Sequence, residues 1–244
     1  SSYVDDFEST QTGIDLRSPY SWFLASTPYD RAADALFPEA ALSNNVDYGK
    51  NRALLNWYFI DRMFTQKNSS LAPGYLKADL AQLSNPYVRE VRSQEIFPGR
   101  QLNYGESSII QTLNLSFYPT ERGPYNLDAD NIDAEGNLLN PEKRWGGIMR
   151  RLDNTNFEQS NIEYVQFWLL NPFLDPDNPN YEGGDLYLNF GEMSEDILKD
   201  GLKSYENGIP VDGNDQYLKE TVWGRVSSQN SLTYSFDNAT GARL

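Results

Sequence analysis

The side chains of this chain that could take part in chemistry are mostly carboxylates. Its 244 residues include 35 Asp and Glu, 20 Lys and Arg, and neither His nor Cys. Their absence excludes disulfides, thiolate nucleophiles, the usual zinc and copper sites, and every Ser-His or Cys-His triad. The glycine pairs Gly146–Gly147 and Gly183–Gly184 also lack the strand and helix that frame a phosphate-binding loop. We therefore expect no enzymatic activity and no organic cofactor.

Acidic oxygen ligands suit calcium, which is the one ligand that the composition leaves open. An EF-hand needs an acid at every second position and a glutamate at the twelfth, but counting from Asp128 these places hold Ile132 and Leu139. The same acids can be solvated turn residues that form Asx turns, so the metal ligands stay unassigned. The candidate groups are Asp128, Asp130 and Asp133; Asp175, Asp177 and Asp185; and, if the first and last strands pair, Asp5, Asp6 and Glu8 with Asp237.

Two alternatives would give the chain a carbohydrate function. A glycosidase needs two carboxylates facing each other about 5–10 Å apart, and the sequence places no two acids in this way. A carbohydrate-binding module needs an exposed strip of aromatic rings. Trp145 and Trp223 stand beside Arg and Gly and are the better candidates for exposure, whereas we expect Trp22, Trp57 and Trp168 in the core.

Two apolar runs carry the strongest strand signal. Residues 162–170 and 185–190 are rich in aromatic and β-branched residues and are separated by a loop of Asp, Asn, Pro and Gly. The first run is apolar on both faces, which predicts a strand covered on both sides. We expect the two runs to be neighbouring, antiparallel and central, with Trp168→Ala costing about 3–5 kcal/mol.

The remaining pattern predicts a mainly β fold, an antiparallel β-sandwich of the jelly-roll, galactose-binding-like kind with a few short helices. In the strand at 107–118, we expect Ile109, Leu113, Leu115 and Phe117 to face the core. Residues 52–63 fit either a helix or a strand, and we favour the strand. Other expected strands are 3–8, 22–25, 221–226 and 232–236, and the expected helices are 30–36, 76–83 and 194–207.

Composition favours one soluble domain over residues 1–244. Hydrophobic residues make up 39% of the chain, enough for a core, and no run of about 18 apolar residues predicts a membrane-spanning helix. No signal sequence opens the chain, which suits an internal fragment. The net charge of −15 disfavours nucleic acid and anionic lipid as partners, because both are bound chiefly through Lys and Arg clusters.

Several motifs follow one another along nearly the whole chain: YVDDFE (3–8), IDLRSPYSWFLASTP (14–28), NRALLNWYFID (51–61), NPYVREV (85–91), EIFP (95–98), RGPYN (122–126), WGGIMRRL (145–152), NIEYVQFWLLNPF (161–173) and the stretch 183–210. In this order they resemble the SprA/Sov family, very large cell-surface proteins of Bacteroidetes tied to gliding motility and type IX protein secretion. No single motif is diagnostic of a mechanism, and the family members are far longer than this chain.

The resemblance implies an internal, non-catalytic structural or interaction domain of an outer-membrane translocon for protein export and gliding motility. The implied partners are other type IX secretion subunits and secreted cargo proteins. The implied location is the cell outer membrane or cell surface, with the domain itself outside the lipid and extracellular rather than periplasmic. A carbohydrate-binding module is the alternative function.

Overall fold

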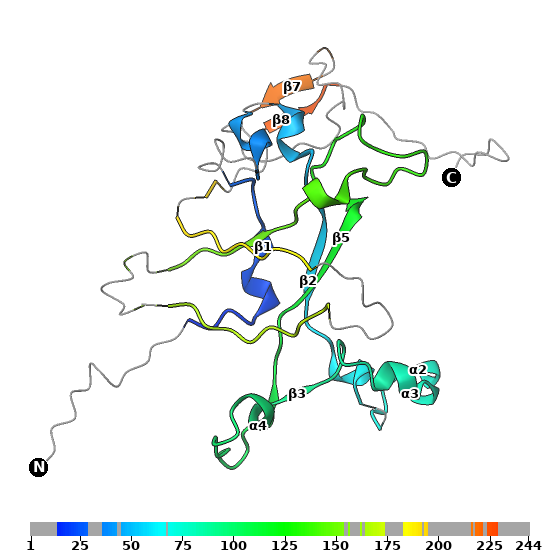
Figure 1. Cartoon of the computed structure of the whole chain (residues 1–244), viewed down its shortest axis with the longest axis vertical. Coiled ribbons are helices and arrows are strands. Elements are labelled where there is room, and N and C mark those ends of the chain that lie inside the picture. Colours follow the sequence, from blue (N-terminus) through cyan, green and yellow to red (C-terminus); the bar gives the residue numbers. More distant parts are fainter. Residues whose placement is uncertain are drawn as a thin grey trace, which may run out of the picture. The chain divides into compact units, whose positions relative to one another are not determined.

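The structure is a computed structural model of the whole chain (Figure 1). The chain divides into two compact units. Unit 1 comprises Ser1–Phe23, Asn56–Ser116 and Arg150–Leu188, and unit 2 comprises Leu24–Leu55, Phe117–Met149 and Asn189–Leu244. The residues that the structure describes are 14–28, 36–42, 45–66, 68–153, 156, 162, 164–173, 183–191, 193–194, 216, 218–221 and 224–228.

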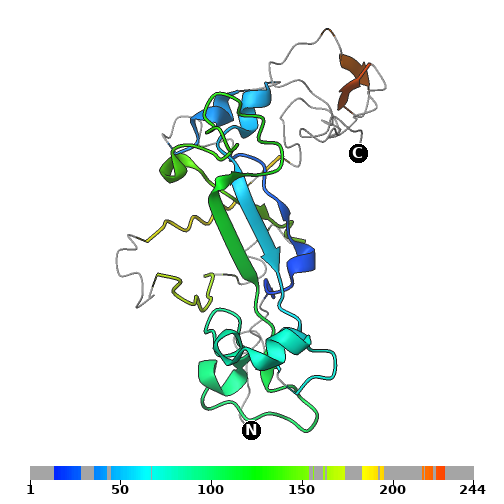
Figure 2. The same cartoon turned by 90° about the vertical axis from the view of Figure 1, so that its right-hand side faces the viewer.

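The described part of the chain is mainly β, as predicted, and its helices are short. Its strands form four two-stranded sheets, and β2 and β5 lie side by side in both views (Figure 1 and Figure 2). The pairs β3–β4 and β7–β8 are antiparallel. The sandwich stays a prediction. The paired strands are β1 (Phe23–Leu24) with β6 (Ile148–Met149), β2 (Ala53–Tyr58) with β5 (Asn114–Arg122), β3 (Val91–Arg92) with β4 (Ile109–Ile110), and β7 (Leu218–Thr221) with β8 (Gly224–Ser227).

The described helices are all short, and local chemistry explains where most of them begin. Proline occupies the first turn of η1, η3 and η6, where its missing N–H costs no hydrogen bond. Asn45, Asp61 and Asp79 cap η4, η5 and α3 through their side-chain oxygens. Their bounds are η1 (Pro19–Ser21), η3 (Pro38–Ala41), η4 (Val46–Gly49), η5 (Arg62–Phe64), η6 (Pro141–Lys143), α2 (Gly74–Ala78), α3 (Leu80–Leu83) and α4 (Ser93–Ile96).

Several expected elements are present with altered bounds. β1 lies within 22–25, β2 confirms the strand favoured over a helix within 52–63, and the helix expected at 76–83 is divided into α2 and α3. The strand expected at 107–118 is interrupted between β4 and β5, and 221–226 includes the end of β7 and most of β8. The segments 3–8, 30–35, 195–207 and 232–236 lie outside the described residues.

The prediction of a buried central strand pair at 162–170 and 185–190 is wrong for the described residues of these runs. No assigned strand includes them, and Trp168 is 67% exposed. The orientation expected around β5 is wrong too, because Leu115 and Phe117 are exposed. Strand propensity reports how well side chains fit a pleated, half-buried surface, and burial also requires a neighbouring segment that covers the strand.

The best-covered aromatic side chain of unit 2 is Tyr48. It is fully buried, and Leu42, Leu127 and Leu218 pack against it. Its hydroxyl donates to the carbonyl oxygen of Thr27 (2.9 Å), and the Thr27 hydroxyl donates back to the Tyr48 carbonyl oxygen (3.2 Å). This exchange satisfies the polar end of a buried tyrosine.

Candidate functional site

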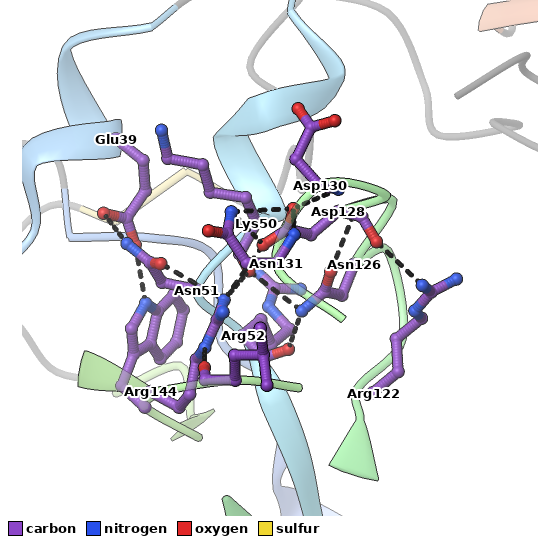
Figure 3. A network of polar contacts seen from close by, with 12 residues as sticks. Glu39, Lys50, Asn51, Arg52, Arg122, Asn126, Asp128, Asp130, Asn131 and Arg144 are labelled. Carbon is purple, nitrogen blue, oxygen red and sulfur yellow. Dashed lines mark hydrogen bonds and ion pairs between the residues drawn. The ribbon is translucent and has the colours of Figure 1, made fainter. Parts of the chain in front are cut away.

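A network of polar contacts joins side chains and backbone groups of unit 2, with its centre buried and Arg122, Asp130 and Asn131 exposed (Figure 3). It joins the turn before β2, the loop after β5 and the segment around η6, which are far apart in sequence. Such a gathering of carboxylates, amides and guanidinium groups is the arrangement in which catalysis or ligand binding would be sought. Its members are Glu39, Lys50, Asn51, Arg52, Arg122, Asn126, Asp128, Asp130, Asn131, Arg144 and Trp145.

Asn126 ties the turn at 122–126 to the chain that enters β2. Its Nδ2 donates to the carbonyl oxygens of Lys50 (3.0 Å) and Arg52 (2.6 Å). Its Oδ1 accepts the backbone N–H of Asp128 at 2.9 Å. The amide thus serves as donor and acceptor between three backbone positions, and it is buried.

Two glycines allow this turn to approach the chain before β2. A Cβ on Gly123 would overlap the carbonyl group of Ala53, and a Cβ on Gly49 would overlap the carbonyl oxygen of Tyr125. Tyr125 itself has φ 59°, a conformation that few residues other than Gly adopt. Residues 122–126 therefore form a tight structural turn.

Arg144 donates four hydrogen bonds within the network. Its Nη1 donates to the Lys50 carbonyl oxygen (2.6 Å), the Asn51 Oδ1 (3.4 Å) and the Asp128 Oδ2 (3.2 Å), and its Nε donates to the Leu139 carbonyl oxygen (2.9 Å). The side chains of Arg144 and Asp128 are only 3% and 5% exposed. A charge pair this deeply buried is tolerated only where further hydrogen bonds replace the lost water.

Asp128 receives those further bonds from its own loop. Burial would raise the pKa of its carboxyl group, but hydrogen bonds from the side chain and backbone of Asn131, from Arg144 and from the Asp130 N–H outweigh burial, and the pKa is lowered. Its Oδ1 accepts from the Asn131 side chain at 3.1 Å and its backbone N–H at 3.2 Å. Asp128 is therefore held as a carboxylate.

Glu39 is the second buried carboxylate of the network, and only 1% of its surface is exposed. Its Oε2 accepts from Asn51 Nδ2 and its Oε1 from the Trp145 indole N–H, both at 2.8 Å. The Trp145 ring packs edge-on against Phe37 with centroids 5.6 Å apart, and the Arg52 guanidinium lies 5.1 Å from its centroid. Trp145 is only half-buried, yet these contacts occupy its ring, so it offers no open platform for a sugar.

The network joins chain segments, and its acids are not placed for acid–base catalysis. Both oxygens of Glu39 and of Asp128 accept hydrogen bonds from fixed donors of the chain. A general acid or base must reach the proton that it transfers on a substrate, and these buried groups are turned toward their own chain. The arrangement fixes three loops against β2.

The candidate calcium ligands that the structure describes engage their own loops. Hydrogen bonds from the side chain and backbone of Asn137 lower the pKa of Asp133, which accepts at 2.9 and 2.7 Å. The Asp185 Oδ2 accepts from the Tyr187 hydroxyl at 3.3 Å. Across the described ranges, no group of three acidic side chains is gathered to hold a metal ion, and calcium stays a prediction. Outside the described residues lie Asp5, Asp6, Glu8, Asp175, Asp177, Trp223 and Asp237.

Sequence reasoning found part of this network and missed its centre. It allowed a turn-forming role for Asp128, but assigned no role to Glu39 or Asn51 and only placed Arg144 beside a tryptophan. No spacing of residues around Arg144 indicates its partners, because these lie 94 and 16 residues away along the chain.

Apolar side chains of the segments 162–170 and 185–190 lie on the surface. Side chains of these types are usually buried, and a group of them that is exposed marks a contact surface for a partner more often than a surface that faces only solvent. We call these residues the exposed apolar runs: Tyr164, Val165, Phe167, Trp168, Leu169 and Leu170, with Leu186, Tyr187, Leu188 and Phe190.

Within the described residues, no helix is long and apolar enough to cross a membrane. Comparison with known proteins adds no identification: no protein-family model matches the chain, and no curated protein matches it significantly.

Proposed function

We propose that this chain is a non-catalytic interaction domain of a SprA/Sov-like outer-membrane translocon of type IX secretion, acting in protein export and gliding motility. The observation that carries the proposal is the exposure of the apolar runs. They belong to NIEYVQFWLLNPF and GGDLYLNF, two of the longest motifs that resemble the family. Apolar side chains of these two motifs are thus available to a partner.

Several properties of the chain support an interaction role. Glu39 and Asp128 accept hydrogen bonds from their own chain and hold loops of unit 2 in place. The partners we propose are other secretion subunits and secreted cargo. The net charge of −15 makes nucleic acid and anionic lipid poor partners. We propose a location at the cell surface, extracellular rather than periplasmic.

An in-frame deletion of the 244 residues from the parent protein tests the role. We expect secretion and gliding to be impaired while the rest of the translocon still reaches the outer membrane. Normal secretion by the deletion strain, with the shortened protein present, would refute the proposal. Cleavage of the domain by protease added to intact cells tests the extracellular location.

Photo-crosslinking locates the contact surface. A crosslinking residue replaces Trp168 in one variant and Tyr104, an exposed aromatic outside the runs, in the matched control. We expect defined adducts with secretion subunits or cargo from position 168 and few from position 104. Equal adduct patterns at both positions would show that the apolar runs have no special part in assembly.

A further inference from the structure

Unit 1 contains a pocket whose walls are almost entirely aromatic. It has a volume of about 370 Å³ and is lined by Pro19, Tyr20, Trp57, Tyr58 and Phe59. This volume falls in the range of small-molecule sites, about 300–1,000 Å³. The proposed role in secretion does not use it.

One wall is the turn η1, which is fixed before any ligand arrives. Proline opens the turn, the Ser21 hydroxyl donates to the Ser18 carbonyl oxygen (2.8 Å), and the Trp22 indole N–H donates to the Leu16 carbonyl oxygen (2.9 Å). Tyr20 is carried at the centre of this turn and is 77% exposed. An aromatic ring held on a rigid turn loses little conformational entropy on binding.

The opposite wall is the end of β2 and the residue that follows it. Trp57, Tyr58 and Phe59 line the pocket from this side. The Tyr58 hydroxyl bonds to the Ser116 Oγ of β5 at 2.8 Å, which anchors Tyr58 across the sheet. The Trp57 indole N–H donates to the Pro19 carbonyl oxygen at 3.1 Å and clamps η1 against the strand.

Four aromatic rings line the pocket: Tyr20, Trp57, Tyr58 and Phe59. The Tyr20 and Phe59 rings lie 5.9 Å apart between centroids and are tilted by 57°. Several aromatic rings around one opening are also the composition of the aromatic cages that bind quaternary ammonium groups. The negative faces of aromatic rings attract a cation, and the methyl groups of such a ligand make apolar contacts with the same rings.

We propose that this pocket binds a trimethylammonium group. None of the five lining side chains carries a formal charge, while the chain as a whole carries −15, which attracts cations over long range. A sugar needs several convergent polar side chains to fix its hydroxyl groups. The lining has no acid, amide or guanidinium group to do so, and the site therefore favours a methylated cation over a saccharide.

Isosteric ligands test the proposal on the 244-residue chain. Choline and its neutral analogue 3,3-dimethylbutan-1-ol have nearly the same shape and differ in charge. NMR titration should show choline shifting the indole resonance of Trp57 with millimolar affinity, and the neutral analogue binding at least about 5-fold more weakly, as expected for one desolvated cation–π contact. Equal binding of the two ligands, or no binding of choline, would overturn the proposal.

Replacing an aromatic ring by an aliphatic side chain separates the cation–π attraction from apolar contact. Tyr20→Leu keeps an apolar side chain on an exposed turn and should weaken choline binding about 2–5-fold with little effect on the neutral analogue. Tyr75→Leu, at an exposed tyrosine of α2 outside the pocket, is the matched control and should leave binding unchanged. If both variants weaken binding equally, the shifts come from non-specific association and the site is refuted.

The trimethylammonium group could come from a free metabolite or from a phosphocholine lipid head group. Titration with choline represents the first source, and sedimentation with phosphatidylcholine vesicles represents the second. Vesicle binding that is lost in Tyr20→Leu assigns the lipid source, and choline binding without vesicle binding assigns the free ligand.

Discussion

The loop network of unit 2 and the exposed apolar runs reverse the usual relation between composition and burial. The network is built from charged and amide side chains, yet Arg144, Asp128 and Glu39 are almost completely buried. The runs at 162–170 and 185–190 are built from aromatic and aliphatic side chains, yet those described are largely exposed. In the first region every buried polar group of the carboxylates has a partner in the chain. In the second region, no segment of the described structure covers the apolar side chains.

The comparison shows that the burial of a side chain depends more directly on the groups that contact it than on its residue type. A buried ion pair persists when hydrogen bonds saturate it, and an apolar strand is buried only when another surface covers it. The two regions therefore have opposite expected responses to mutation. Substitutions in the network should act on folding, and substitutions in the runs should act on association.

The largest effect is expected from breaking the buried ion pair. Arg144→Met removes the cation and leaves the Asp128 carboxylate buried without its charge partner, which should cost about 3–5 kcal/mol of unfolding free energy. Urea denaturation at pH 7 measures the change. Arg62→Met is the control, because Arg62 pairs with Glu90 at 3.4 Å on the surface and its loss should cost at most about 1 kcal/mol.

A loss of under 1 kcal/mol for Arg144→Met would show that the pair contributes little and that unit 2 is held by apolar contacts alone. Asp128→Leu combined with Arg144→Met refines the result. Because the double variant leaves no isolated charge, it should recover part of the stability lost in the single variant.

The next largest effect concerns the turn at 122–126. Gly123→Ala places a Cβ against the Ala53 carbonyl group and should cost about 1–3 kcal/mol through overpacking. Gly74→Ala is the matched control: nothing lies within 4 Å of a Cβ at this position, which begins α2, and the change should be neutral or stabilise by up to about 1 kcal/mol. Thermal melts of both variants measure the contrast, and equal melting temperatures would show that the turn can move away from β2.

The sequence predicted best those elements whose cause is local. The strand-forming residues of 52–63 produce β2, and the helix expected at 76–83 is present as α2 and α3. The mainly β character follows from the same local preferences.

The sequence did not predict what depends on distant partners. The partners of Arg144 lie on Lys50 and Asp128, 94 and 16 residues away. No periodicity marks such a position. The burial of 162–170 was wrongly predicted for the same reason, since strand propensity is a local property and the covering surface is not.

Acid titration tests the network with a smaller effect. The folded-state pKa of Asp128 lies below its ordinary value of 3.8, so its ionisation stabilises the fold above that pH and the contribution is lost as pH falls through the folded pKa. Unfolding free energies of the native chain and of Asp128→Asn should differ most at neutral pH and converge below about pH 4. Other carboxylates titrate in both proteins, so the difference isolates Asp128. A difference independent of pH would contradict the assigned ionisation.

The smallest effect on stability is expected from truncating an exposed side chain of the apolar runs. Trp168→Ala in the isolated chain should change the unfolding free energy by no more than about 0.5 kcal/mol, because the side chain is 67% exposed. Leu55→Ala, at a buried position of β2, is the matched truncation and should cost about 2–5 kcal/mol.

In the proposed assembly the order of the two effects reverses, since removing a tryptophan that is buried on association can cost about 2 kcal/mol or more of binding free energy. Denaturation of the isolated variants and crosslinking yield in cells measure the two sides. A loss of about 3–5 kcal/mol for Trp168→Ala in the isolated chain would mean that 162–170 is a covered strand of this chain, and the contrast between the two regions would disappear.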